Sequence, residues 1–296
     1  MKLKKLIAIT ATIAMSISIF VGCGSSETTT EDTANNSTTE ETNESSLPED
    51  VQEIVDRGVL RVGVKNAVQG FGYQDPLTKE YSGMEISIAQ DIADYLGVDV
   101  EYTSVTAATR TELLDSGDID CVLATFTITD ERKESWDFST PYYTDHVTVL
   151  VENSSGIKTI EDLIGKTVGV SSGSTSAKSL VEAMIEKGVI TGEGYSADTF
   201  DASMWTEGVK FQQYDDYPTI SMALNAGEVD AFCVDKSILA IYNTDGRSYI
   251  EDEFAPQDYG VATKKGSGLS TVVNELVEKW LNDGTIDSLI SENGLE

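Results

Sequence analysis

Arg132 and Asp235 stand at positions where each needs a partner of opposite charge. Arg132 falls in the first turn of a predicted helix whose N-cap is Asp130, where the helix dipole disfavours a cation. A bidentate contact to a carboxylate would explain it, and an exposed surface arginine is the alternative. Asp235 directly follows the apolar run 229–234, so it ends a predicted strand and suits an ammonium group. Capping of a helix over 236–242 is the alternative for Asp235.

Two turns rich in hydroxyl groups could assist these charges. Thr125 and Thr127 follow the apolar run 119–124, which predicts a buried strand. Ser174 and Thr175 lie in a loop of small residues between a second strand pattern and a helix that runs to about residue 186. Free backbone N–H groups at a helix start form an anion site, to which hydroxyl groups can add donors. An ordinary capped helix is the alternative.

Composition excludes several classes of site. The 296 residues include 20 basic and 51 acidic side chains, which gives a net charge of −31. Such a chain lacks the basic face that a nucleic-acid binder uses to neutralise phosphates. His146 is the single histidine. This excludes a zinc site with two histidines and any His-based catalytic triad that does not contain His146. We expect no metal and no cofactor.

Helical and strand patterns alternate from residue 47 onward. Glycines stand where helices should end, at Gly58 and Gly97. The predicted elements of this first part are a helix from 49, a strand over 59–64, a helix over 84–96, a strand over 98–102, a helix over 109–115 and a strand over 119–124. The alternation predicts βαβ units and a mostly parallel sheet.

The pattern then repeats. Leu-x-x-Gly-Asp-Ile-Asp at 114–120 matches Leu-x-x-Gly-Glu-Val-Asp at 224–230, and Val-Gly-Val at 62–64 recurs at 168–170. Two α/β lobes of similar layout are therefore expected. Ligands of open α/β sheets bind beyond the carboxyl ends of the strands. The two offsets place Lys65 opposite Ser171 and Thr125 opposite Asp235, which predicts a small ligand held in one cleft.

The first 46 residues predict export rather than folded structure. Lysines followed by a short apolar run make residues 1–22 a signal peptide, because a membrane span needs about 20 apolar residues. Val21-Gly22-Cys23 resembles a bacterial lipobox, which implies lipidation of Cys23; an ordinary signal is the alternative. Residues 23–46 are polar and acidic and predict a disordered tether. Cys121 and Cys233 lie in apolar runs and are expected to be buried free thiols.

Seven segments together resemble one family, the polar amino-acid binding proteins of ABC importers (solute-binding protein family 3). These segments are 58–64, 83–86, 120–133, 138–143, 163–170, 227–230 and 259–261. The resemblance covers about residues 50–293. It implies an α/β fold of two lobes, a type II periplasmic-binding-protein-like clamshell with the ligand cleft between them. Lobe 1 is expected over 47–146 and 254–296, and lobe 2 over 147–253, with chain crossings near 144–149 and 252–257.

The same resemblance implies roles for individual residues. The arginine that matches Arg132 binds the ligand α-carboxylate, assisted at Thr127 and Thr175, and the aspartate that matches Asp235 binds the α-ammonium. Several short motifs resemble the glutamate/aspartate and glutamine branch, in which residues that match Lys65 and Arg110 hold the side-chain carboxylate. The full set of expected ligand-binding residues is Lys65, Phe71, Arg110, Thr125, Phe126, Thr127, Arg132, Ser174, Thr175, Tyr217, Asp235 and Tyr259.

Charge favours an acidic ligand. Three cations (Lys65, Arg110 and Arg132) and one aspartate give the predicted site a charge of +2, and glutamine would leave one cation without a charged partner. An acid from elsewhere in the fold could change this count. The expected protein is a monomeric receptor, lipid-anchored on the outer face of the cytoplasmic membrane, that delivers glutamate or aspartate to an ABC permease. The alternatives are a receptor for glutamine or another polar amino acid, a sensor, and an enzyme such as a cyclic-acid dehydratase on the same fold.

Overall fold

A five-stranded sheet forms the centre of the first lobe. The computed structural model describes residues 47–295, so the predicted signal peptide, Cys23 and tether lie outside the described residues. The strand order is β5-β1-β6-β14-β7. The strands are β1 (Val59–Val64), β5 (Asp99–Ser104), β6 (Cys121–Leu123), β7 (Trp136–Phe138) and β14 (Ala262–Lys264). Strand β1 is parallel to β5 and β6, whereas β14 is antiparallel to β6 and β7. The predicted parallel arrangement therefore holds for β5, β1 and β6.

Helices and a small sheet surround this first sheet. They are α1 (Glu49–Arg57), α2 (Met84–Leu96), α3 (Thr109–Ser116), α4 (Asp130–Ser135), α8 (Gly268–Asp283) and α9 (Thr285–Glu292), with the short strands β2 (Ala67–Val68), β3 (Gly72–Gln74) and β4 (Tyr81–Ser82). Helix α2 buries Ile88 and Ile92, whereas Tyr95, which the spacing places on the same face, is exposed near the C-terminal end of the helix. Gly97 ends α2 in the left-handed conformation, with φ of 69°.

The second lobe is built on a six-stranded sheet. Its strand order is β10-β9-β11-β8-β12, with β13 paired to β8. The elements are β8 (Tyr143–Glu152), β9 (Thr167–Ser171), β10 (Lys210–Tyr214), β11 (Ala231–Asp235), β12 (Arg247–Tyr249), β13 (Phe254–Tyr259), the helices α5 (Ser176–Glu186), α6 (Tyr217–Ala226) and α7 (Lys236–Leu239), and the 3-10 turns Asn153–Ser155, Ile160–Leu163 and Ala240–Tyr242. Strands β9, β10 and β11 run parallel to one another, and β8 is antiparallel to β11.

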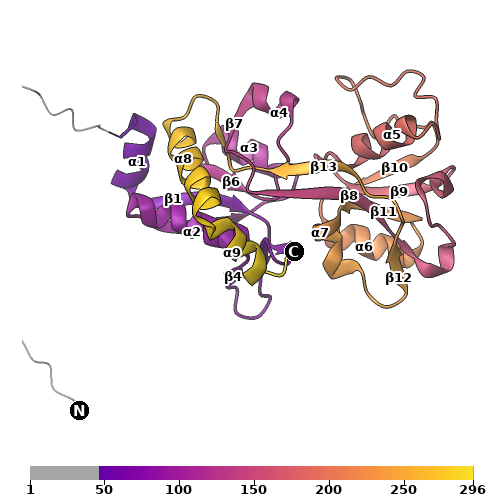
Figure 1. The fold of residues 1–296 in the computed structure, drawn as a ribbon, viewed down its shortest axis with the longest axis horizontal. Coiled ribbons are helices and arrows are strands. Elements are labelled where there is room, and N and C mark those ends of the chain that lie inside the picture. Colours follow the sequence, from indigo (N-terminus) through magenta and orange to yellow (C-terminus); the bar gives the residue numbers. More distant parts are fainter. Residues whose placement is uncertain (1–46, 296) are drawn as a thin grey trace, which may run out of the picture. The chain divides into compact units, whose positions relative to one another are not determined.

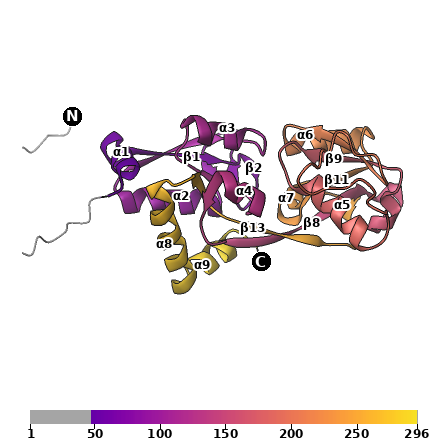
Figure 2. The ribbon, with the colours of Figure 1, turned by 90° about the horizontal axis from the view of Figure 1, so that it is seen from above.

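Two neighbouring strands, β8 and β13, connect the lobes (Figures 1 and 2). They pair antiparallel, with Phe254 opposite Val147 and Tyr259 opposite Tyr143. Strand β8 leads from β7 into the second sheet, and β13 leads back to β14 in the first sheet. The lobe boundaries predicted at 146/147 and 253/254 fall within β8 and at the start of β13, and their exact positions remain predictions.

The sequence repeat has a packing reason in both sheets. A Cβ added to Gly63 of β1 would lie 2.6 Å from the Ile119 side chain, and one added to Gly169 of β9 would lie 2.6 Å from the Ile220 side chain. Each Val-Gly-Val strand therefore carries a glycine where an apolar side chain packs onto it.

Cys121 and Cys233 are both buried and free, as expected, in different sheets. Within residues 47–295, no helix is long and apolar enough to cross a membrane.

Candidate ligand-binding site

The carboxyl ends of the central strands carry the predicted site residues. Lys65 follows β1, Thr125 follows β6, Ser171 ends β9 and Asp235 ends β11. All four side chains are buried. Lys65 and Ser171, one from each lobe, line the same cavity of about 240 Å³, together with Tyr217 from the start of α6. The two lobes thus present their strand ends to each other, as the offsets in the sequence predict.

Three cations gather near these strand ends without acidic partners. Lys65 and Arg110 are only 4% and 3% exposed, and Arg132 is partly buried. Within residues 47–295, none of the three forms an ion pair with a carboxylate. The guanidinium carbons of Arg110 and Arg132 lie 3.8 and 4.7 Å from the centroid of the Phe126 ring. Phe126 therefore holds both arginines by cation–π contacts.

Besides burial, the charge of Arg110 lowers the pKa values of the other two cations. Burial and then the nearby Arg110 charge lower the pKa of Lys65 well below its usual value. Burial and then Arg110 also lower the pKa of Arg132, to about 9. Burying a charge without a partner is costly, and like charges nearby add to that cost. A negatively charged ligand would remove much of this cost.

Arg132 reaches across the two lobes. Its Nη1 donates to the Thr127 carbonyl oxygen at 2.7 Å, and its Nη2 donates to the Gly173 carbonyl oxygen of the second lobe at 3.1 Å. The predicted Asp130 cap is wrong, because the N-cap of α4 is Thr129, whose hydroxyl accepts from the Arg132 backbone N–H. Thr129 has the extended backbone that an N-cap needs, whereas Asp130 is already helical.

A second cavity, of about 580 Å³, adjoins these arginine contacts. Its lining includes Phe126, Arg132, Ser174 and Thr175, so it draws on both lobes. Ser174 directs its hydroxyl to the Ser171 carbonyl oxygen at 2.7 Å and closes the turn after β9. The structure therefore brings Ser174 and Thr175 to the cleft, and the Ser174 hydroxyl serves the local turn.

Asp235 is held by a tyrosine rather than by the helix that follows it. Its Oδ2 accepts a hydrogen bond from the Tyr259 hydroxyl at 2.5 Å, and its side chain makes no capping contact with α7. Its buried Oδ1 has no hydrogen-bond partner in the described chain. Burial, and next the charge of Asp145, raise the pKa of Asp235 to about 7. An ammonium group at Oδ1 would supply the missing donor and favour the ionised carboxylate.

The hydroxyls of Thr127 and Thr175 meet at a residue that the sequence reasoning missed. Both donate to Oε1 of Gln257, at 2.8 and 2.7 Å. The Gln257 amide nitrogen donates to the Ala255 carbonyl oxygen at 2.9 Å, which fixes the orientation of the amide. Gln257 thereby joins a threonine from each lobe. The sequence pattern could have indicated Gln257, because it precedes Tyr259 by two positions and therefore lies on the same buried face of β13.

Glu85 is a second residue outside the expected set of ligand-binding residues. It is fully buried at the start of α2, and its Oε1 accepts from the Thr125 backbone N–H and the Tyr142 hydroxyl, both at 2.6 Å. Its Oε2 lacks a hydrogen-bond partner in the described residues. An acidic residue in the first turn of a helix usually faces solvent and complements the helix dipole. The sequence pattern therefore did not indicate that Glu85 is buried.

Aromatic side chains enclose the inner part of the site. Phe71, predicted as a contact, is fully buried and meets Tyr143 and Tyr259 edge-on, with ring centroids 5.0 and 5.7 Å apart. Tyr217 is 6% exposed and lies under the Lys65 ammonium, whose Nζ is 5.2 Å from the ring centroid. These rings exclude water from the charged groups, which strengthens electrostatic interactions there.

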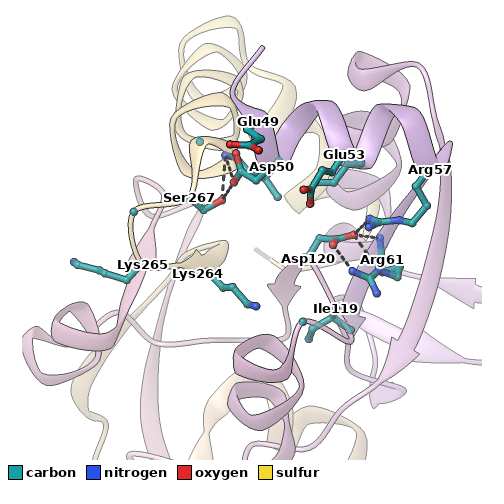
Figure 3. A pocket seen from close by; sticks show the side chains of 15 residues that line it. Glu49, Asp50, Glu53, Arg57, Arg61, Ile119, Asp120, Lys264, Lys265 and Ser267 are labelled. Carbon is teal, nitrogen blue, oxygen red and sulfur yellow. Dashed lines mark hydrogen bonds and ion pairs between the residues drawn. The ribbon is translucent and has the colours of Figure 1, made fainter.

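Another cavity lies at a different place in the first lobe and contains none of the predicted site residues (Figure 3). It has a volume of about 610 Å³ and is lined by α1, β1 and the segment before α8. Its arginines, Arg57 and Arg61, both pair with Asp120. Because these charges satisfy one another, the cavity offers less to a charged ligand than the strand ends do.

The chain matches a family of known proteins over nearly all of its described length. The model of the bacterial extracellular solute-binding proteins, family 3, matches residues 60–294. The ABC transporter glutamine-binding protein GlnH of Bacillus subtilis (strain 168) is 30% identical over 294 residues, which cover 97% of this chain and 96% of the relative. The L-cystine-binding protein TcyJ of Escherichia coli (strain K12) is 32% identical over 245 residues, which cover 81% of this chain and 84% of the relative.

Solved structures agree with this assignment. An ancestral arginine-binding protein bound to arginine is 33% identical and superposes with a TM-score of 0.66, covering 80% of this chain and 98% of that one. The likeness extends over both lobes and confirms the type II periplasmic-binding fold. From its sequence, its fold and its cleft, this chain belongs to the bacterial extracellular solute-binding proteins of family 3.

Proposed function

We propose that this chain is the substrate-binding protein of an amino-acid ABC importer and that its ligand is glutamate or aspartate. One observation carries the choice of an acidic ligand. Lys65, Arg110 and Arg132 are gathered at the strand ends, and none of them has a carboxylate partner in the described chain. The matching relatives are named as amino-acid-binding proteins, so the enzymatic alternative is set aside.

The charge balance also favours an acidic amino acid. The fold adds the buried Glu85 to the site, so its three cations and two acids sum to +1 rather than the +2 expected from the sequence. Glutamate and aspartate carry two carboxylates and one ammonium, a net −1, and would bring the site to neutrality. Glutamine would leave one positive charge uncompensated, and arginine would leave two. Relatives named for glutamine, cystine and arginine binding are consistent with a family whose ligand depends on such local charges.

Each charged group then has a role. Arg132, oriented by Thr127 and Gly173, would bind the α-carboxylate. Asp235 would accept the α-ammonium at its unpartnered Oδ1. Lys65 and Arg110 would hold the side-chain carboxylate. Because Arg132 and Lys65 each contact residues of the second lobe, binding would favour closure of the lobes on the ligand and present the loaded receptor to the permease.

A binding profile tests this proposal. Residues 24–296 would be titrated calorimetrically with each of the twenty amino acids. Glutamate and aspartate should bind, and glutamine should bind at least about tenfold more weakly because it leaves a buried cation unpaired. Tight binding of another amino acid, with neither acidic one bound, would show that the ligand assignment is wrong.

The raised pKa of Asp235 predicts a pH dependence of affinity. The pKa is about 7 in the unliganded site, and the ligand ammonium should lower it, so binding requires the ionised form and releases protons. Affinity should therefore fall by about tenfold between pH 8 and pH 6. The lowered pKa of Lys65 acts on affinity with the opposite sign, because falling pH favours its charged form. An Asp235→Asn variant keeps Lys65, so the difference between the two pH profiles isolates Asp235, and identical profiles would contradict its role.

Export and anchoring complete the proposal. The family is extracellular, which fits the predicted signal peptide. A lipid on Cys23 would tether the receptor to the outer face of the cytoplasmic membrane through residues 24–46. A Cys23→Ser variant should appear in the culture medium instead of the membrane fraction. Unchanged membrane retention of this variant would argue against the lipid.

A further inference from the structure

Glu85 is placed by the backbone and cannot move far. Helix α2 begins at Met84, and the preceding Gly83 has a φ of 124°, where a Cβ would lie 2.2 Å from the Phe71 carbonyl oxygen. Only glycine allows so close an approach. The backbone N–H of Glu85 then donates to that same carbonyl oxygen at 3.1 Å. The carboxylate is consequently fixed beneath the loop that follows β6.

The carboxylate is linked to Arg110 through one residue. Oε1 of Glu85 accepts from the Thr125 backbone N–H, and the Thr125 carbonyl oxygen accepts from Nη1 of Arg110 at 3.2 Å. Thr125 has a φ of 44°, in the left-handed region that non-glycine residues seldom adopt. Glu85 therefore stabilises an unfavourable backbone conformation that directs a carbonyl oxygen to the arginine.

The charge of Glu85 also acts on the cations of the site. Arg110 and Lys65 both lie within its electrostatic influence, and Asp235 is the other acid that acts on both. Asp145 lies beside Asp235 instead: after burial, its charge is the next cause that raises the pKa of Asp235, and its carboxylate accepts hydrogen bonds from Ser237 and Tyr259. Burial raises the pKa of Glu85, and the hydrogen bonds from Tyr142 and Thr125 and the charges of Lys65 and Arg110 act against that rise and favour the ionised form.

We infer that Glu85 is a specificity-determining positioning residue, an internal counter-charge that fixes how much negative charge the ligand may carry. With Glu85 ionised, the site has a net charge of +1, which is matched by an amino acid with a net charge of −1. Without that charge, the site would sum to +2 and would prefer anionic ligands more strongly. This inference rests on the proposed acidic ligand, but its test compares two ligands and does not require that the acidic one bind more tightly.

A Glu85→Gln variant separates charge from structure. Glutamine keeps an oxygen that can accept from Thr125 and Tyr142, and removes the charge. Glutamate and glutamine, which have the same shape and differ by one charge, would be titrated at pH 8. The affinity for glutamate relative to that for glutamine should rise by about tenfold or more, as expected for the removal of one buried charge that acts on the same cations. Circular dichroism would verify folding, and Glu85→Met provides a second uncharged side chain of similar length.

A Tyr142→Phe variant is the matched control. It removes one hydrogen bond that Glu85 accepts and leaves the charge in place, so the ratio should stay within about twofold of the wild-type value. An unchanged ratio in Glu85→Gln and Glu85→Met, or an equal shift in Tyr142→Phe, would overturn the inference. Failure of the wild-type protein to bind an acidic amino acid tightly would instead count against the proposed function, because the ratio can still be measured from weak binding.

Discussion

Replacing Arg132 with alanine is expected to weaken ligand binding by about 30-fold to several thousand-fold, which corresponds to about 2–5 kcal/mol. The change would leave the ligand α-carboxylate buried without its charged partner. It would also remove the contact from Arg132 to the Thr127 carbonyl oxygen and the contact to the Gly173 carbonyl oxygen, which joins the two lobes. Calorimetric titration with the best-binding amino acid would measure the loss.

Two variants control for this result. Arg132→Lys keeps the positive charge but not the planar fork, so it should retain part of the affinity. Arg57→Ala removes an arginine that pairs with Asp120 in the cavity of Figure 3, and it should leave ligand affinity unchanged. If Arg132→Ala bound the ligand as tightly as the wild-type protein does, Arg132 would not be the carboxylate-binding residue.

A Lys65→Met variant should have opposite effects on binding and on stability. Lys65 is 4% exposed and has no acidic partner in the described chain, so its charge is costly in the unliganded protein. An apolar side chain of similar length should raise the free energy of unfolding by about 1 kcal/mol or more. Glutamate affinity should fall by about 2–5 kcal/mol, because its side-chain carboxylate would lose a buried cation.

Glutamine provides the comparison for Lys65. Because its side chain is uncharged, its affinity should change much less in Lys65→Met than that of glutamate. Urea unfolding of the unliganded protein would give the free energy of unfolding, and calorimetry would give the affinities for glutamate and for glutamine. Equal weakening of glutamate and glutamine would mean that Lys65 supports the site without reading the charge of the side chain.

The sequence predicted the parts of the fold whose causes are local. Strand β1 and helix α2 have the predicted bounds, because alternating apolar residues and the left-handed Gly97 act within a few positions. The cap of α4 was misplaced by one residue because Thr129 and Asp130 are both good caps, and the backbone path that decides between them is set by the sheet. Strand β14 joins the first sheet from a segment far along the chain, which no local pattern encodes.

The sequence predicted which of the candidate residues lie at the strand ends better than it predicted their contacts. The repeat and the strand ends located Lys65 and Asp235, because strand ends of open α/β sheets converge whatever the details of packing. That Thr127 donates to Gln257 could not be foreseen, because the two residues are 130 positions apart and meet only through β13. Glu85 was left out of the expected ligand-binding set for a similar reason, since its burial depends on the approach of α2 to Phe71.

The central claim is that a group of buried cations selects an amino acid with a second carboxylate. Calorimetric titration of the wild-type protein with glutamate, aspartate and glutamine, at pH 8 and in parallel, tests it most directly. We predict tight binding of glutamate or aspartate, with glutamine at least about tenfold weaker. Glutamine binding as tightly as both acidic amino acids, or more tightly, would contradict the account.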